Sequence, residues 1–315
     1  MKKFKTLDEQ ILLLKSRGLI IPDEQYAKNY LLSNNYYNII NGYSKYFPRS
    51  GDNYTNKTTF DEVSRLYLFD KELKQEIFRA LISVESHLKA IFAHRFAETY
   101  PSKPYAYLDT ACYDSNKKLL VATTIYQLAK IINRYKQISD TSIYHYYNKY
   151  NDVPIWVLAN YLDFGELRYM LTFSPTKLQN KVAKDFEDFI KQHINSSTLF
   201  SPEIMLSFIE NINDVRNICA HNNRLIGYQC RRDSKYWQPL HKPYNIAASD
   251  SRRSVYTVFI STQCFLSRAE YASLHNTIRK LMNHHLERYL FSISPNTILA
   301  TLGFPKDWYK TVGKL

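Results

Sequence analysis

Glycine is scarce in this sequence, with 7 glycines among 315 residues, against roughly 7% in an average protein. No two glycines have the spacing of G-x-G-x-x-G or G-x-x-x-x-G-K-S/T. The chain therefore lacks, as sequence motifs, the loops that hold phosphates in dinucleotide-binding and P-loop enzymes. So few glycines also argue against an all-β fold, because such folds need many tight turns.

Cysteine pairs and long apolar runs are missing as well. The four cysteines contain no C-x-x-C pair, which excludes zinc-finger and thioredoxin-like motifs and favours a reducing, cytoplasmic setting. The basic N-terminus, Met1 to Lys5, is not followed by the apolar segment of a signal peptide. No stretch approaches the roughly 18 apolar residues of a bilayer span, so we expect no membrane-spanning helix.

Positive charge and tyrosine are in excess. Lysine and arginine number 42 against 29 acidic residues, a net charge of +13, and there are 27 tyrosines. Such a balance favours polyanionic partners, among which RNA, DNA and an anionic membrane surface are the candidates. Tyrosine rings stack on nucleobases, which favours nucleic acid, although a tyrosine in a helical protein more often packs between helices.

Apolar spacing predicts helices along most of the chain. The strongest pattern covers residues 60–92, where apolar residues recur three and four apart. We expect one long helix here, or two helices with a bend near Asp70, because the pattern exceeds a typical globular helix. Gly18 stands where a glycine ends a helix. Ser201-Pro202-Glu203 predicts the start of another helix, whose apolar stripe runs to Cys219.

These patterns predict an all-α helical bundle with four regions. The regions are an N-terminal helical region (1–50), a helical core (58–225), a basic irregular insertion (226–253) and C-terminal helices that pack on the core (254–315). Residues 49–57 look like a loop. Residues 255–265 have the β-branched content of a strand, but we favour a helix because the apolar pattern continues to Leu286.

The basic insertion combines charge with aromatic rings. Residues 224–253 carry seven basic and two acidic residues, a charge of +5, with tyrosine and tryptophan interleaved. Cations neutralise phosphates and rings stack on bases, so the segment is predicted to bind RNA. The predicted RNA-binding residues are Arg224, Arg231, Arg232, Lys235, Tyr236, Trp237, Arg252 and Arg253.

The most informative segment is Arg216-Asn-Ile-Cys-Ala-His221, at the end of the helix that starts near Ser201. Asn213, Asn217, His221 and Arg224 follow steps of four, four and three, which predicts one polar helix face. Arg216 lies five residues before His221, about 140° around an ideal helix. We expect its long side chain to reach back toward the same cleft.

Arginine, asparagine and histidine together suit cleavage of an RNA phosphodiester, in which the ribose 2′-hydroxyl is the nucleophile. His221 can remove the hydroxyl proton or protonate the leaving oxygen. Arg216 can bind the phosphate and stabilise the transition state, while the Asn217 amide can orient the histidine or the phosphate. One histidine fills one of the two proton-transfer roles, so a homodimer would supply the second. No metal or other cofactor is required. The alternative is that these residues only cap and solvate a helix end.

Metal binding is not expected elsewhere. His284 and His285 are adjacent, and adjacent residues on a helix point about 100° apart. No acidic partner is expected beside them. The pair is therefore predicted to lie in the core or at the surface without a metal.

The motif resembles the R-x(4–6)-H motif of HEPN domains. Its extension, Arg-Asn-x-Cys-Ala-His-x-x-Arg-Leu, resembles the signature of the Abi_2 group of abortive-infection proteins (AbiD/AbiF-like). Other segments match the family in order: 68–73 and 82–85 resemble its long first helices, and Gly303-Phe304-Pro305 with Trp308 resembles its C-terminal element. One departure is Asn222, where many relatives have a second histidine.

The resemblance implies a HEPN-type helical bundle with an N-terminal helical extension, usually a homodimer with the two motifs facing each other. It implies metal-independent ribonuclease activity or RNA binding in phage defence by growth arrest, and AbiF-like members are linked to a partner non-coding RNA. By position, Arg216 and His221 are the catalytic pair and Asn217 the polar helper. The alternatives are a non-catalytic RNA-binding ribonucleoprotein component and a DNA-binding regulator, although no recognition helix is evident for the latter.

Overall fold

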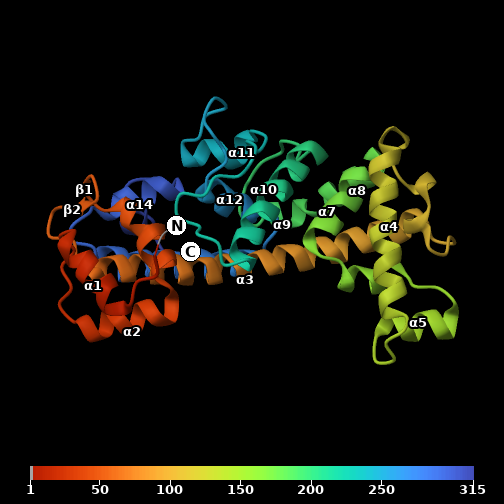
Figure 1. The fold of residues 1–315 in the computed structure, drawn as a ribbon. Coiled ribbons are helices and arrows are strands. Elements are labelled where there is room, and N and C mark those ends of the chain that lie inside the picture. The colour runs from red at the N-terminus through yellow and green to blue at the C-terminus, as the bar shows by residue number, and fades with distance from the viewer. Residues whose placement is uncertain (1–2) are drawn as a thin grey trace.

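The computed structural model describes residues 3–315, so Met1 and Lys2 of the basic N-terminus lie outside the described residues. Helices dominate the described chain (Figure 1), which confirms the all-α prediction. Residues 49–57, predicted as a loop, contain a small antiparallel hairpin of β1 (Arg49–Ser50) and β2 (Asn53–Tyr54). The hairpin is too short to contribute a sheet to the core.

A single helix, α3 (Phe60–Thr99), forms the axis of the molecule (Figure 1). Its 40 residues span about 60 Å. Thr59 begins it with a capping box, in which its side chain accepts from the Glu62 N–H and the Glu62 carboxylate accepts from the Thr59 N–H. Of the two predicted alternatives, the structure has the uninterrupted helix, with Asp70 inside it.

Short helices gather at the N-terminal end of α3 (Figure 1). They are α1 (Leu7–Ser16), α2 (Glu24–Asn34), the π-helix η1 (Tyr37–Asn41) and the 3-10 helix η2 (Ser44–Tyr46). Gly18 follows α1 with a φ of +77°, and its N–H donates to the Lys15 carbonyl. Gly18 therefore ends the helix as predicted, in a backbone conformation that glycine adopts at little cost.

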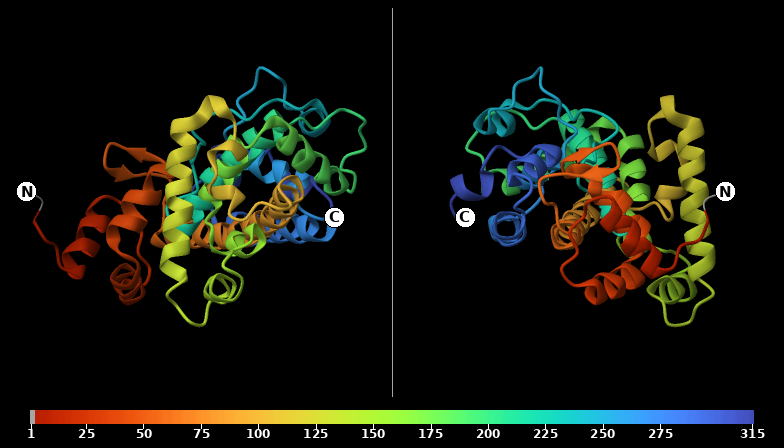
Figure 2. Two further views of the ribbon diagram at one scale, coloured as in Figure 1. Left: turned by 90° about the vertical axis from the view of Figure 1, so that its right-hand side faces the viewer. Right: turned by 60° about the vertical axis from the view of Figure 1, so that its left-hand side comes forward.

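The C-terminal end of α3 is covered by the middle of the chain. Figures 1 and 2 show α4 standing across this end, with α5 at its foot. The elements here are η3 (Ala106–Leu108), η4 (Thr110–Cys112), η5 (Ser115–Lys117), α4 (Lys118–Tyr135), α5 (Ser142–Tyr150), α6 (Ile155–Leu158), η6 (Ala159–Tyr161), α7 (Phe164–Phe173), α8 (Thr176–Asp185) and α9 (Glu187–Ile190).

Two long helices pack along α3, namely α10 (Pro202–Ala220) and α13 (Arg268–Leu281). Residues 255–265 form α12 (Val255–Ser261) and η8 (Thr262–Cys264), so the preference for helix over strand is confirmed. The other elements of this part are α11 (Gln238–His241), η7 (Lys242–Tyr244), the π-helix η9 (Met282–Glu287), α14 (Pro295–Leu302) and α15 (Trp308–Thr311).

All four predicted regions contribute to one continuous core, from Ile11 of α1 to Tyr309 of α15. The C-terminal element packs closely against Ser254 at Gly303. The φ of Gly303 is +80°, and a Cβ there would lie 2.4 Å from the Ser254 side chain, so only glycine fits. Within residues 3–315 no helix is both long and apolar enough to cross a bilayer.

Candidate functional site

Helix α10 carries the Arg216–His221 motif, and both its ends follow local sequence rules. Ser201 is the N-cap, with its hydroxyl accepting from the Ile204 N–H at 3.4 Å, and Pro202 occupies the first turn. The predicted start is therefore confirmed. The helix ends at Ala220, which makes His221 the C-cap residue. The four predicted polar positions consequently do not share one helix face, because Arg224 lies beyond the helix.

The turn after His221 is a Schellman motif, in which two N–H groups return to the last carbonyls of a helix. The Asn222 N–H donates to the Cys219 carbonyl at 3.1 Å, and the Asn223 N–H donates to the Ile218 carbonyl at 3.0 Å. Asn222 has a φ of +52°, a conformation that asparagine tolerates better than most residues. The residue that departs from the family pattern therefore suits this turn.

A buried carboxylate on α3 holds the chain just after this turn. Asp70 is completely buried. Its Oδ1 accepts from the N–H groups of Leu225 (3.1 Å) and Ile226 (2.8 Å), and its Oδ2 accepts from the Tyr43 hydroxyl (2.7 Å). Burial and the neighbouring Asp70 carboxylate raise the pKa of Tyr43 above its usual value, so this phenol stays a proton donor.

One turn further along α3, Lys74 holds Asn222 itself. Its ammonium group donates to the Asn222 Oδ1 at 2.8 Å and lies 3.4 Å from the Asp70 Oδ2. Lys74 is 5% exposed, so this charge is compensated inside the protein rather than by water. Asp70 and Lys74 of α3 thus position the backbone around His221.

Arg224 ties the N-terminal region to the same turn. Its Nη1 donates to the Gly42 carbonyl at 2.7 Å and its Nε to the Ile226 carbonyl at 3.3 Å. The Tyr46 hydroxyl also donates to the Ile226 carbonyl, at 2.8 Å. Arg224 was predicted only as an RNA-binding residue, but two of its N–H groups stabilise the fold.

Arg216, the first residue of the motif, also lies against α3. Its Nη2 is 3.4 Å from the Glu85 carboxylate, its Nη1 donates to the Asn217 Oδ1 at 3.4 Å, and its guanidinium lies 5.7 Å from the centre of the Phe78 ring. Its Nε is buried and has no hydrogen-bond partner within residues 3–315. The guanidinium is therefore held in place but retains an unsatisfied donor.

The structure brings Arg216 and Asn217 together but leaves His221 outside their contact. The His221 side chain is exposed, and no described residue of the chain makes a hydrogen bond or ion pair with it. The Asn217 amide therefore contacts Arg216, a partner that was not predicted for it, rather than the histidine. The imidazole is presented to solvent from a turn whose backbone is fixed.

The basic insertion folds back along α10, away from His221. The Arg231 N–H donates to the Asp214 carboxylate at 3.3 Å, and the Lys235 N–H donates to the Ser207 hydroxyl at 2.9 Å. Only α11 and η7 interrupt its irregular course. The predicted irregular conformation is confirmed, but its basic residues are spread along α10 rather than gathered at the motif.

Two of the predicted RNA-binding residues stabilise the insertion itself. Trp237 is 3% exposed and packs 5.1 Å from the Phe200 ring, which contradicts its predicted role of stacking on RNA. The guanidinium of Arg252 is occupied by four backbone carbonyl groups, those of Ser234, Ala247, Ala248 and Asp250. The Arg252 side chain replaces regular hydrogen bonds that the irregular backbone lacks, and Trp237 contributes by packing.

The remaining predicted RNA-binding residues of the insertion differ in exposure and in whether they form ion pairs. Lys235 lies 3.5 Å from Glu203, and Arg253 lies 3.6 Å from Asp233, both as surface ion pairs. Tyr236 is half-buried and stacks on a histidine. Arg231 and Arg232 are exposed, and within residues 3–315 neither forms an ion pair. They are the members most available to an anionic partner.

The comparison with known families gives one match. The Abi-like protein family (Abi_2) is matched over residues 29–227, more than half of the chain. The chain belongs to the Abi-like protein family. This membership associates it with abortive infection, a defence against phages. No curated protein and no solved structure matches it.

The matched segment of this Abi-like protein begins within α2 and ends at Gly227. It therefore contains η1, α3, α10 and the turn held by Asp70, and it ends at the second residue of the basic insertion. Asp70, Lys74 and Glu85 were missed as site residues. Each is buried on α3 beside apolar residues. The sequence could have indicated them, because each is a polar residue next to the apolar stripe of residues 60–92.

Two other features of the Abi-like chain lie apart from the motif. His285 is buried and its Nε2 lies 2.9 Å from the Glu72 carboxylate of α3, so an acidic partner is present after all. Even so, no group of three or more His, Cys, Asp or Glu residues that could hold a metal ion occurs in residues 3–315.

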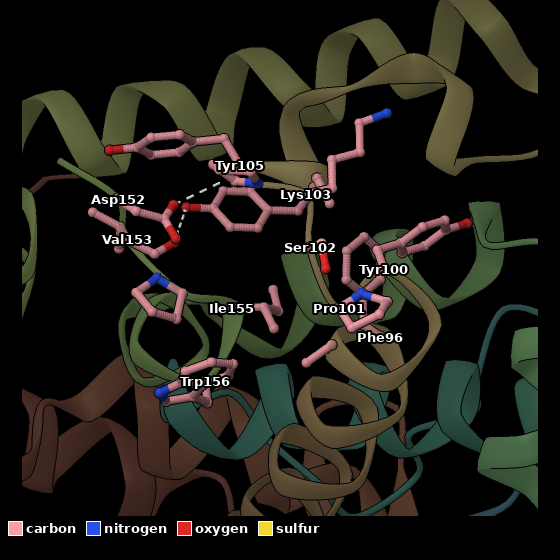
Figure 3. A pocket seen from close by; sticks show the side chains of 15 residues that line it. Phe96, Tyr100, Pro101, Ser102, Lys103, Tyr105, Asp152, Val153, Ile155 and Trp156 are labelled. Carbon is pink, nitrogen blue, oxygen red and sulfur yellow. Dashed lines mark hydrogen bonds between the residues drawn. The ribbon is translucent and has the colours of Figure 1, made fainter. Parts of the chain in front are cut away.

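The second feature is a cavity of about 470 Å³ at the C-terminal end of α3 (Figure 3). The Tyr107 hydroxyl donates to the Val153 carbonyl and the Tyr105 N–H to the Asp152 carboxylate, which joins its two walls. Phe96, on its wall, is 11 residues along α3 from Glu85, the partner of Arg216, roughly 16 Å away. The cavity is therefore not part of the motif site.

Proposed function

We propose that this Abi-like protein is a metal-independent endoribonuclease of the HEPN type that acts as a homodimer. The observation that carries the proposal is the Arg216–His221 motif itself. It combines a partly buried guanidinium that has an unsatisfied Nε donor with an exposed imidazole on a fixed turn. These are the groups that phosphodiester transfer to a ribose hydroxyl requires.

The proposed reaction forms and breaks one P–O bond each. The imidazole of His221 removes the proton of the ribose 2′-hydroxyl, and the 2′-oxygen attacks the adjacent phosphorus. The bond from phosphorus to the 5′-oxygen breaks, and this oxygen takes a proton from a second imidazolium. The products are a 2′,3′-cyclic phosphate and a 5′-hydroxyl. Arg216 stabilises the charge that develops on the non-bridging oxygens.

Because Arg216 pairs with Glu85, an RNA phosphate would bind the guanidinium in competition with this carboxylate. Both side chains are partly buried, with 23% and 11% exposure, and their charges offset each other at 3.4 Å. A phosphate oxygen would compete with Glu85 for the guanidinium. The Nε donor supports this role, since a buried N–H normally has a partner, and none is present within residues 3–315.

A homodimer would provide the second proton-transfer group. The motif of one chain contains one histidine, whereas the proposed reaction uses a base and an acid. Ile82 lies on α3 between Phe78 and Glu85 and is 49% exposed, so an apolar side chain borders the arginine. A two-fold interface here would bring the second imidazole to the same phosphate.

RNA binding outside the cleavage site would use the exposed cations of the insertion. Arg231 and Arg232 supply two positive charges that no ion pair within residues 3–315 neutralises. We further propose that a cognate non-coding RNA bound there restrains the nuclease until infection. RNA cleavage would then arrest the infected cell.

The decisive experiment compares purified wild type with His221→Ala and Arg216→Ala on an end-labelled single-stranded RNA, with EDTA present. The wild type should cleave and leave a 2′,3′-cyclic phosphate, and each variant should be at least about 100-fold slower. The control is His94→Ala, because His94 is exposed on α3 outside the motif. Equal cleavage by wild type and His221→Ala would refute the assignment. RNA binding without cleavage would favour a non-catalytic ribonucleoprotein component.

A further inference from the structure

A cavity of about 220 Å³ adjoins the motif turn. Its walls come from η1, from α3 and from the residues that follow His221. Among its lining residues are Tyr37, Asn38, Asn41, Tyr67, Asn222 and Asn223. We infer that this cavity is a subsite for one nucleobase of single-stranded RNA, with adenine as the preferred base. The inference rests on the proposed RNA cleavage and adds a source of sequence preference to it.

The size of the cavity suits a single base. Pockets for drug-sized ligands measure about 300–1,000 Å³, and this one is smaller. It is therefore too small for a folded cofactor and large enough for a base turned out of a strand.

The chemistry of the lining suits the edge of a base. Each asparagine amide offers a donor and an acceptor side by side, the arrangement that pairs with the N6 and N7 atoms of adenine. The side-chain amides of Asn41 and Asn223 make no hydrogen bond within residues 3–315, and Asn38 makes one long contact of 3.5 Å. These amides are free to bind, whereas Asn222 is engaged by Lys74.

An aromatic ring completes the subsite. Tyr37 lines the cavity and is 68% exposed, although tyrosine normally buries most of its ring. A base that enters the cavity can stack on this ring, and stacking does not depend on the identity of the base. Tyr37 therefore supplies affinity, and the asparagine amides supply discrimination.

The walls of the cavity are positioned before any ligand binds. Lys74 is fixed to Asn222, and Arg224 is fixed to the Gly42 carbonyl, so two cations border the cavity in held positions. Its third wall, η1, is a π-helix, a conformation that occurs frequently at functional sites. A preformed pocket loses little conformational entropy on binding.

The place of the cavity connects it with the cleavage site. Asn222 and Asn223 directly follow His221, and Lys74 lies one turn of α3 from Phe78, about 6 Å, where Phe78 contacts Arg216. A base in the cavity would therefore belong to a nucleotide next to the phosphodiester that Arg216 and His221 engage. The N-terminal region, which contributes η1, would select the cleavage site.

The test uses the full chain and a pool of random-sequence single-stranded RNA, with sequencing of the cleavage ends. Wild type should favour adenine at one position beside the cleaved bond. Asn38→Ala/Asn41→Ala should lower this preference at least fivefold, and Tyr37→Ala should slow cleavage about tenfold without changing the preference. Asn29→Ala, an exposed asparagine of α2 outside the cavity, should behave as wild type.

A second measurement separates this inference from the proposed function. Fluorescence anisotropy with His221→Ala gives the affinities for short oligoadenylate, oligouridylate and oligocytidylate without cleavage. Tighter binding of oligoadenylate that is lost with Asn38→Ala/Asn41→Ala would support the subsite even if wild type cleaves nothing. An unchanged base preference in both assays, from variants with a wild-type circular dichroism spectrum, would overturn it.

Discussion

The motif turn (residues 216–225) and the basic insertion (226–253) are neighbours in the sequence, yet different groups stabilise their backbones. The backbone of the motif turn is held by side chains of other elements, chiefly Asp70 and Lys74 of α3. The backbone of the insertion is held partly by Asp214, Ser207 and Asn211 of α10 and partly by its own Arg252. His221 stays exposed, whereas Arg252 and Trp237, which were predicted to bind RNA, are engaged in the fold.

This difference shows why composition alone overstates a binding surface. The insertion has more arginine and aromatic residues in total, but its irregular backbone leaves many carbonyl groups without regular partners, and Arg252 satisfies four of them. The motif turn has fewer charged residues, but its backbone N–H groups already have partners in α10 and in Asp70. Four predictions test this comparison, from the largest expected effect to the smallest.

The largest effect is expected from Asp70→Ala. The substitution removes the acceptor for Leu225, Ile226 and Tyr43 and leaves the buried Lys74 without its carboxylate. Removing one partner of a buried charge pair costs about 3–5 kcal/mol, and the free energy of unfolding in urea should fall by that amount. The control Glu76→Ala, on the surface of α3, should change it by at most ~0.5 kcal/mol. A loss below about 1 kcal/mol for Asp70→Ala would show that the turn does not depend on α3.

The second-largest effect is the pH dependence of stability that His241 of the insertion is expected to cause. Burial lowers the pKa of His241 from 6.5 to about 4, so between these values the unfolded chain binds a proton that the folded chain does not. Stability should therefore fall as the pH drops from about 6.5 to 4, by about 2–3 kcal/mol from this residue. Unfolding measured from pH 7 to pH 4 should show a shallower loss for His241→Phe.

The control for this prediction is His94→Phe, since His94 is exposed. It should keep the pH dependence of the wild type. The same pH dependence in His241→Phe and wild type would mean that His241 is not held neutral by the insertion. In that case the insertion would be less firmly packed than the contact of His241 with the Trp237 N–H indicates.

The third effect comes from Arg252→Ala, which leaves several carbonyl groups of the insertion without their donor. The expected loss is about 1–3 kcal/mol in the free energy of unfolding. The neighbouring Arg253→Ala removes only a surface ion pair with Asp233 and should cost at most ~0.5 kcal/mol. Equal losses from the two variants would contradict the structural role of Arg252.

The smallest effect is expected from Arg231→Ala and Arg232→Ala. Both residues are exposed, so the stability should stay within about 0.5 kcal/mol of wild type. If they contact phosphates, RNA binding should weaken a few-fold for each, and the slope of log affinity against log salt should fall by about one. Lys306→Ala, an exposed lysine near the C-terminus, should leave the slope unchanged. An unchanged slope in the arginine variants would remove the insertion from the RNA interface.

Much of the fold follows from local patterns that are visible in the sequence. The spacing of apolar residues predicts α3, and Ser201-Pro202-Glu203 predicts the first turn of α10, because periodicity and capping act within a few residues. The same signals placed the motif near the end of α10 but wrongly extended its polar face to Arg224, since the helix ends at Ala220. No glycine follows His221 to mark the turn, and Asn222 takes the left-handed position instead.

The candidate site was predictable in its residues but not in its contacts. Arg216, Asn217 and His221 stand out by type and spacing, and the family match includes them. Their partners do not, because Asp70 and Glu85 lie more than 120 residues earlier in the chain. Likewise, nothing in the insertion distinguishes the buried Trp237 from an exposed ring, since a single aromatic residue suits either place.

The sequence by itself therefore determined the helical class, the helical pattern over residues 60–92 and the Arg216–His221 motif to which we assign the chemistry, since all three depend on residues close together in the chain. Only the tertiary structure decided which polar groups remain free. Packing of α10 against α3 places Arg216 beside Glu85, buries Asp70 under the motif turn and brings η1 to the turn after His221. The scarcity of glycine excludes phosphate-binding loops, whereas the fixed turn and the cavity beside it depend on contacts between distant segments.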